Sequence, residues 1–98
     1  MTLLKEYDFE NLKNESETHV LDELERQLST FKGEICLCND CIVDMAAVAL
    51  NNVKPLYRYS LLGTLYTQDA ISNKTYAESV RDAVWEAIIK IKKNPSHS

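Results

Sequence analysis

The sequence contains few of the residues that interrupt regular secondary structure, since its 98 residues include only two glycines and two prolines. This scarcity is typical of a helical chain, because Gly and Pro are the strongest helix breakers. No stretch of about 18 consecutive apolar residues is present, so we expect no transmembrane helix. The N-terminal residues also lack the apolar core of a signal peptide. We therefore expect a cytoplasmic protein, in a compartment where thiols stay reduced and can bind metal.

An excess of positive charge is also missing. The formal net charge is −4, which argues against direct binding to DNA or RNA, because such binding depends on neutralising phosphates. Residues 1–50 contain eleven acids and four bases (−7), whereas residues 51–98 contain four acids and seven bases (+3). An anionic ligand is therefore expected in the second half, where the basic residues begin at Lys54 and Arg58. The lysines near the C-terminus have a simpler explanation, since they complement the dipole of the last helix.

Patterns typical of catalysis are absent as well. The chain has no glycine-rich loop that would cradle a phosphate, no Ser/His/Asp set and no paired carboxylates beside a suitable His. We therefore do not expect an enzyme.

The chain does contain enough apolar residues, 45% of the total, for one small hydrophobic core. We expect residues 1–98 to form a single domain. Its predicted fold is mainly α, a small bundle of about four helices with one short extended segment. Residues 1–13 are predicted to form an N-terminal arm or a short helix, and residues 94–98 a C-terminal tail.

Apolar residues recur at helical spacing in two segments. The first helix is expected to start near Asn14, which can act as its N-cap, and to stop at Gly33. The last helix is expected to begin around residues 73–75 and to end at Asn94 and Pro95. The predicted core stripe of the last helix is Tyr76, Val80, Ala83, Val84, Ala87, Ile88 and Ile91.

A further helix between these two is apolar nearly all round. Asn39 or Asp40 is expected to cap its start, and it runs to about Asn52 before Pro55 breaks it. A helix without a polar face is buried on most sides, and a chain of 98 residues has few other elements to surround it. We therefore expect a dimer with this helix near the interface. Residues 56–60, which follow, are aromatic and extended in character.

All three cysteines of the chain fall within six residues, as Cys36, Cys38 and Cys41. Thiolates at this C-x-C-x-x-C spacing are close enough to share one soft divalent cation, and structural zinc is the metal that we expect. The alternative is that the three thiols are buried as small apolar side chains. No general base is near in sequence, so a catalytic metal is not implied.

A structural zinc site needs a fourth ligand, which must come from elsewhere in the chain. The two histidines are His19 and His97, and Asp40, Asp44 or a water could also complete the shell. Each histidine has a simpler interpretation, since His97 lies in the predicted tail and His19 early in a helix.

The residues around the cysteine cluster resemble one family along most of the chain, the late competence development (ComFB) family. The residues that carry the resemblance are Cys36, Cys38, Cys41, Asp44, Ala49, Leu50, Asn51, Pro55 and Tyr57. Two positions depart from the family pattern: Lys54 stands where a second Pro is frequent, and Arg58 where a small or β-branched residue is usual. The resemblance favours His97 as the fourth ligand, because some members have a late Cys near that position.

The resemblance implies a homodimer that binds a cyclic dinucleotide, such as cyclic di-AMP or cyclic di-GMP, and signals to a protein partner. Such ligands need Arg or Lys for their phosphates and flat side chains for their bases. The candidate ligand-binding residues are Asn51, Lys54, Tyr57 and Arg58. A simpler interpretation is that Tyr57 and Tyr59 share a buried face and leave Arg58 in water, while Asn51 only ends a helix.

The alternative function is a structural zinc-binding adaptor without a nucleotide ligand, whose acidic helix (residues 15–25) docks a basic protein. Arg58→Ala separates the two functions, because it abolishes ligand binding in the first and changes nothing in the second. The sequence does not specify the dinucleotide, the metal, the protein partner, or whether competence is the process regulated.

Overall fold

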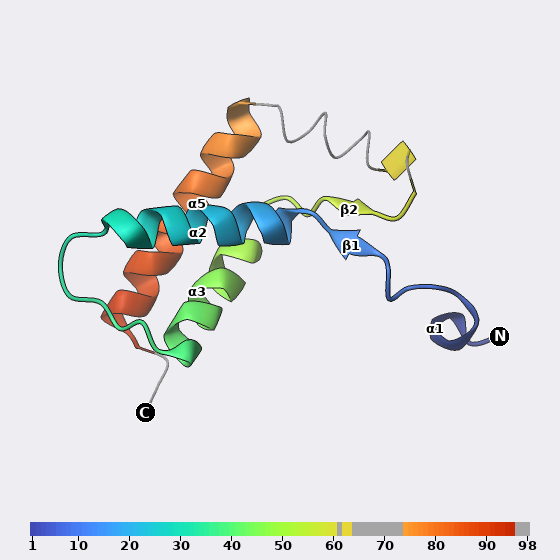
Figure 1. The fold of residues 1–98 in the computed structure, drawn as a ribbon, viewed down its shortest axis with the longest axis horizontal. Helices are drawn as coiled ribbons and strands as arrows, with labels where there is room; N and C mark the ends of the chain where they lie inside the picture. Colours follow the sequence, from blue (N-terminus) through green and yellow to red (C-terminus); the bar gives the residue numbers. More distant parts are fainter. Residues whose placement is uncertain (61, 64–73, 96–98) are drawn as a thin grey trace.

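The computed structural model describes residues 1–60, 62–63 and 74–95, which form a helical body and one small β-ribbon (Figure 1). In chain order the elements are α1 (Leu3–Glu6), β1 (Lys13–Asn14), α2 (Ser16–Thr30), α3 (Asn39–Leu50), β2 (Tyr57–Arg58) and α5 (Lys74–Lys93). The prediction of a mainly α chain with about four helices and a short extended segment is confirmed. None of the described helices has the length and apolar character that a membrane span requires.

The body consists of three helices that pack on one another, and the contact between α3 and α5 is the most extensive. Figure 1 shows α2 crossing in front of α5, with α3 below it. The predicted stripe of α5 is confirmed, because its Val80, Ala83, Val84, Ala87 and Ile88 are buried and its Tyr76 and Ile91 pack on the same cluster. From the other helices, the buried apolar side chains of the core are Val20, Leu24, Cys41, Met45, Ala46 and Ala49.

The start of α2 is fixed by the side chain of Asn14. Its Oδ1 accepts a hydrogen bond from the backbone N–H of Ser16 at 3.2 Å. The predicted N-cap is nevertheless wrong, because Glu15 is the N-cap of α2 and its side chain makes no capping hydrogen bond. The Oδ1 of Asn14 also accepts the Ser16 hydroxyl at 2.7 Å and the backbone N–H of Leu56 at 2.8 Å. Asn14 therefore joins β1, α2 and the segment before β2.

The ribbon pairs two segments that are far apart in the sequence. β1 and β2 are antiparallel, with Lys13 opposite Arg58 and Asn14 opposite Tyr57. The backbone N–H of Glu15 extends this ladder by donating to the carbonyl of Leu56 at 2.7 Å. This pairing places residues 57–59 beside the start of α2.

The N-terminal twelve residues lie away from the helical body, and α1 is at the far end of the ribbon (Figure 1). The molecule is therefore elongated, with extents of 48 × 33 × 18 Å. The exposed large apolar side chains of this arm are Met1, Leu3, Leu4, Tyr7, Phe9 and Leu12.

Candidate metal centre and ligand segment

The three cysteines converge at the N-terminus of α3. Cys36 and Cys38 are half-buried in the loop that precedes the helix, Cys41 is buried in its first turn, and their Sγ atoms all lie within 4.8 Å of one another. Tetrahedral zinc with Zn–S bonds of about 2.3 Å separates its sulfurs by about 3.8 Å. The loop is therefore close to the geometry of three thiolate ligands, and a contraction of at most about 1 Å would complete it.

The helix α3 begins on a sulfur, which corrects the predicted cap. Asn39 and Asp40 were expected to cap the helix, but Cys38 is its N-cap and its Sγ accepts the backbone N–H of Cys41 at 3.4 Å. Asn39 and Asp40 instead occupy the first turn. A cysteine at a helix N-terminus is favoured as the thiolate, because the helix dipole stabilises negative charge there. This environment suits a metal ligand, since zinc binds the thiolate form.

A hollow of about 290 Å³ opens beside two of the sulfurs and is lined by Cys36, Cys38, Asn39 and Asp40. The hollow leaves room for a fourth ligand next to the cysteines. Asp40 lines the same hollow, but among the described residues its carboxylate is not grouped with the three sulfurs. The donor set thus fits a soft divalent cation with three sulfur ligands and one further group.

The two histidines have different outcomes. His97 lies outside the described residues, so its role as the fourth ligand stays a prediction. His19 is half-buried on α2, where its ring makes an edge contact with Tyr76 at 6.5 Å between centroids. Within the described part of the chain, His19 is not among the residues grouped with the cysteines.

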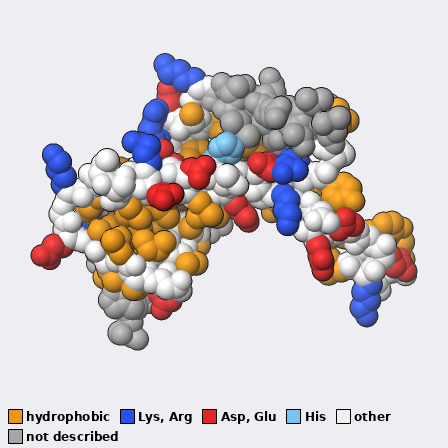
Figure 2. All heavy atoms as spheres, viewed as in Figure 1, with side chains coloured by type: hydrophobic (Ala, Val, Ile, Leu, Met, Phe, Trp, Pro, Cys, Tyr) orange, Lys and Arg blue, Asp and Glu red, His pale blue; other side chains and the backbone are white. Residues whose placement is uncertain are grey.

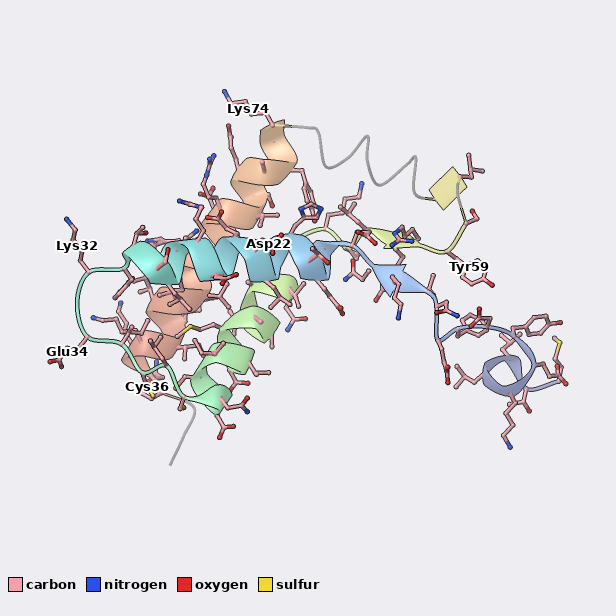
Figure 3. The ribbon with its side chains drawn as sticks, in the orientation of Figure 1. Asp22, Lys32, Glu34, Cys36, Tyr59 and Lys74 are labelled. Atoms are coloured by element: carbon pink, nitrogen blue, oxygen red, sulfur yellow. The ribbon has the colours of Figure 1, made fainter. Side chains whose placement is uncertain are left out.

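The candidate ligand residues lie in the connection between α3 and β2. Asn51 is the C-cap of α3, and its backbone N–H donates to the carbonyl of Ala47 at 3.1 Å. Lys54 is exposed, and its carbonyl accepts the Tyr76 hydroxyl at 3.3 Å, which ties the connection to α5. Figure 3 places Cys36 and Tyr59 on opposite sides of the molecule, so the ligand segment is remote from the cysteine cluster.

The alternation along β2 is the reverse of the simpler interpretation given above, which is therefore wrong. The residues Tyr57 and Tyr59 are 59% and 57% exposed, whereas the Arg58 side chain is 36% exposed and forms an ion pair through its Nε with Oε1 of Glu15. The hydroxyl of Tyr59 donates to Asp8 at 3.1 Å, and this hydrogen bond raises the pKa of Tyr59.

The partner of Arg58 could not be found by sequence reasoning. Glu15 lies 43 residues earlier in the chain, immediately before α2, and the many acids of that region do not single it out in the sequence. Only the pairing of β1 with β2 brings the two side chains together. A sequence signal for such a pairing is weak, because each strand has only two residues.

Comparison with known proteins agrees with this description. The family model described as late competence development protein ComFB matches residues 13–95. Among solved structures, the chain is similar to the late competence protein ComFB from Bacillus subtilis, with 25% sequence identity and a TM-score of 0.69. The match covers 87% of this chain and 92% of the other. No curated protein matches the chain. The likeness inferred from the cysteine and Pro-x-Tyr residues is confirmed, and the chain belongs to the late competence development protein ComFB family.

Proposed function

We propose that this protein is a homodimeric receptor for a cyclic dinucleotide, with a structural zinc held by its cysteines. The observation that carries the proposal is the arrangement along β2, where exposed tyrosine rings flank a guanidinium. The ring of Tyr57 offers a flat face for a base, and Arg58 with the nearby Lys54 offers positive charge for phosphates. Asn51, at the end of α3, supplies an amide for hydrogen bonds to a base.

The ion pair with Glu15 defines how Arg58 would meet a phosphate. Its Nε–H is donated to Glu15, and a guanidinium carries four further N–H groups that can bind an anion. The carboxylate holds the guanidinium in position before the ligand arrives, which lowers the entropy cost of binding. Glu15 stands immediately before α2. A ligand that binds Arg58 would therefore change the ion pair that Arg58 makes at the start of that helix.

The dimer in this proposal uses the apolar surface of α2 and α3. Figure 2 shows hydrophobic side chains gathered on one face between these helices. Leu21 on α2, Leu37 in the loop and Val43 on α3 are each more than half exposed, which is unusual for large apolar side chains in a small domain that remains alone. A second copy is the proposed cover, because a two-fold symmetric ligand suits an interface between identical subunits.

Zinc has a structural role in this proposal. Cys36, Cys38 and Cys41 would hold the ion with His97 as the fourth ligand. Figure 1 draws the end of α5 near the start of α3, and these helices pack together, so α5 ends on the side of the molecule where the cysteines lie. The ion would fix the loop before α3 and thereby the α2–α3 surface.

The test is isothermal titration of the full chain with cyclic di-AMP and cyclic di-GMP. We expect saturable binding of at least one, loss of binding in Arg58→Ala, and unchanged binding in Lys74→Ala, which removes an exposed cation from the start of α5. Sedimentation of the same samples gives the subunit number. Absence of binding by both dinucleotides at protein concentrations of about 50 µM would refute the receptor function.

The second candidate is the zinc-binding adaptor, which the exposed acids of α2 favour. Glu17, Asp22 and Glu25 are all exposed on this helix, and they form a negative surface that can attract a basic protein. In that case Arg58→Ala leaves partner binding unchanged, whereas reversing the charge of Asp22 and Glu25 weakens it.

A further inference from the structure

A hollow of the molecule lies between the C-terminal half of α2 and the middle of α5. Its volume is about 560 Å³, within the range of pockets that hold small organic ligands, about 300–1,000 Å³. Figure 3 shows Lys32 at the C-terminal end of α2, which forms one end of this hollow. The side chains that line it are Arg26, Gln27, Thr30, Phe31, Lys32, Arg81, Asp82 and Trp85.

The lining is basic although the chain is acidic. Three of its residues, Arg26, Lys32 and Arg81, are positively charged and only Asp82 is negatively charged, in a chain with fifteen acids and eleven bases. The cations come from two different helices and the loop after α2, and all three line the same space. Such a cluster suits an anion such as a phosphate, which arginine binds with two parallel hydrogen bonds.

The same hollow contains the only tryptophan of the chain. Trp85 is 50% exposed, and its ring meets Phe31 with centroids 6.0 Å apart and planes tilted by 42°. Phe31 holds the indole from one side, and the exposed part of the indole remains accessible. An exposed indole face beside guanidinium groups is the combination that stacks on a nucleotide base while the phosphate is neutralised.

Hydrogen bonds hold the basic wall in place. Arg26 donates to both carboxylate oxygens of Glu23, at 2.9 and 2.6 Å, and Gln27 Nε2 links Glu23 at 2.6 Å to the carbonyl of Arg81 at 3.0 Å. The Oε1 of Gln27 is buried and finds no hydrogen-bond partner among the described residues. The two helices are thus fastened to each other directly beside the hollow, so its shape is set before a ligand binds.

We infer that this hollow binds a nucleoside phosphate, with the base against Trp85 and the phosphate on Arg81 and Lys32. The site does not involve residues 51–58 and does not depend on the function proposed above. Asp82 at its rim offers an acceptor for an exocyclic amino group or a ribose hydroxyl.

Fluorescence of Trp85 tests this site directly, because no other tryptophan contributes to the signal. The full chain is titrated with AMP and with GMP, and with inorganic pyrophosphate as an anion without a base. We expect a saturable change with at least one nucleotide and a weaker response to pyrophosphate. Arg81→Gln should raise the Kd by about tenfold, the scale expected for a charged hydrogen-bonded contact, while Lys90→Gln, on the same helix outside the hollow, changes it less than about twofold.

Three results would overturn the inference. The first is the absence of a saturable change up to about 1 mM of either nucleotide. The second is equal affinity of Arg81→Gln and the unmodified chain, given the same circular dichroism spectrum for both. The third is a pyrophosphate response as tight as that of the nucleotides, which would reduce the hollow to an unspecific anion patch. Arg58→Ala separates this site from the proposed receptor site, because it should leave the Trp85 response unchanged.

Discussion

Replacing Asn14 by Ala removes one oxygen that accepts three hydrogen bonds. The N–H of Ser16 and the buried Ser16 hydroxyl lose their acceptor, and the N–H of Leu56 loses its bond to β1. Loss of one hydrogen bond costs about 1 kcal/mol, and a buried donor left unsatisfied costs about 1–3 kcal/mol. Because water reaches part of this half-buried site, we expect Asn14→Ala to lower the free energy of unfolding by about 2–4 kcal/mol.

The assay is urea unfolding followed by circular dichroism at 222 nm, a probe of helix content, with Asn14→Asp as the control that keeps an oxygen acceptor at the same position. Asn14→Asp should lose less than about half as much stability, since its carboxylate keeps an oxygen acceptor for the same three donors. A double-mutant cycle with Ser16→Ala isolates the hydroxyl contact, and we expect the two losses to be less than additive. A loss below about 1 kcal/mol in Asn14→Ala would refute the reasoning, because it would mean that the junction bears little of the stability.

Three further predictions concern the metal, the pH response and the loop after α2. Zinc should raise the midpoint of thermal unfolding, and Cys36→Ser should remove most of that gain while the zinc-free midpoint changes little; an equal gain in both proteins would exclude Cys36 as a ligand. The guanidinium of Arg26 donates to Glu23 and holds the pKa of that carboxyl below its usual 4.5, so the pair stabilises the fold above this value and the contribution is lost as the pH falls through the lower folded pKa. Glu23→Gln should therefore flatten the loss of stability below pH 4.5, by less than about 1 kcal/mol because Arg26 is exposed, and acid titrations that superimpose would contradict this. Gly33 has a φ of +114°, so Gly33→Ala should destabilise the fold by about 1 kcal/mol through backbone strain, and unchanged urea stability would show that the loop relaxes.

The sequence predicted the features that depend on neighbours along the chain. The stripe of α5 repeats at helical spacing, so the buried positions from Val80 to Ile88 followed from periodicity alone. The cysteine cluster followed from spacing, because a short loop keeps its sulfurs together whatever the rest of the fold does. Asn14 lies close to the start of α2, as predicted, but Glu15 is the N-cap, and the contact of Asn14 with Leu56 was not foreseen.

The predictions that were wrong concern features that depend on long-range geometry or on weak local preferences. The burial of Arg58 against Glu15 requires the register of β1 and β2, which a pair of two-residue strands does not encode visibly. The cap of α3 was assigned to Asn39 or Asp40 because these residue types are the stronger caps. The backbone of Cys38 is extended, with φ −70° and ψ 163°, so the helix starts one residue earlier and the sulfur takes the capping position.

Because Cys38 caps α3 with its sulfur, a chemical change at the cysteine cluster would act directly on the first turn of this helix. Sγ of Cys38 accepts the N–H of Cys41, and oxidation of this thiol to a sulfinic acid would replace a single soft acceptor by a larger charged group. The twelve residues of α3 form a rod of about 18 Å, with the cysteines at one end and Asn51 at the other. An oxidant that reaches the cluster would therefore act on the end of the helix opposite the proposed ligand segment. Oxidation would weaken the hydrogen bond that Cys38 accepts from Cys41 and loosen the first turn of α3.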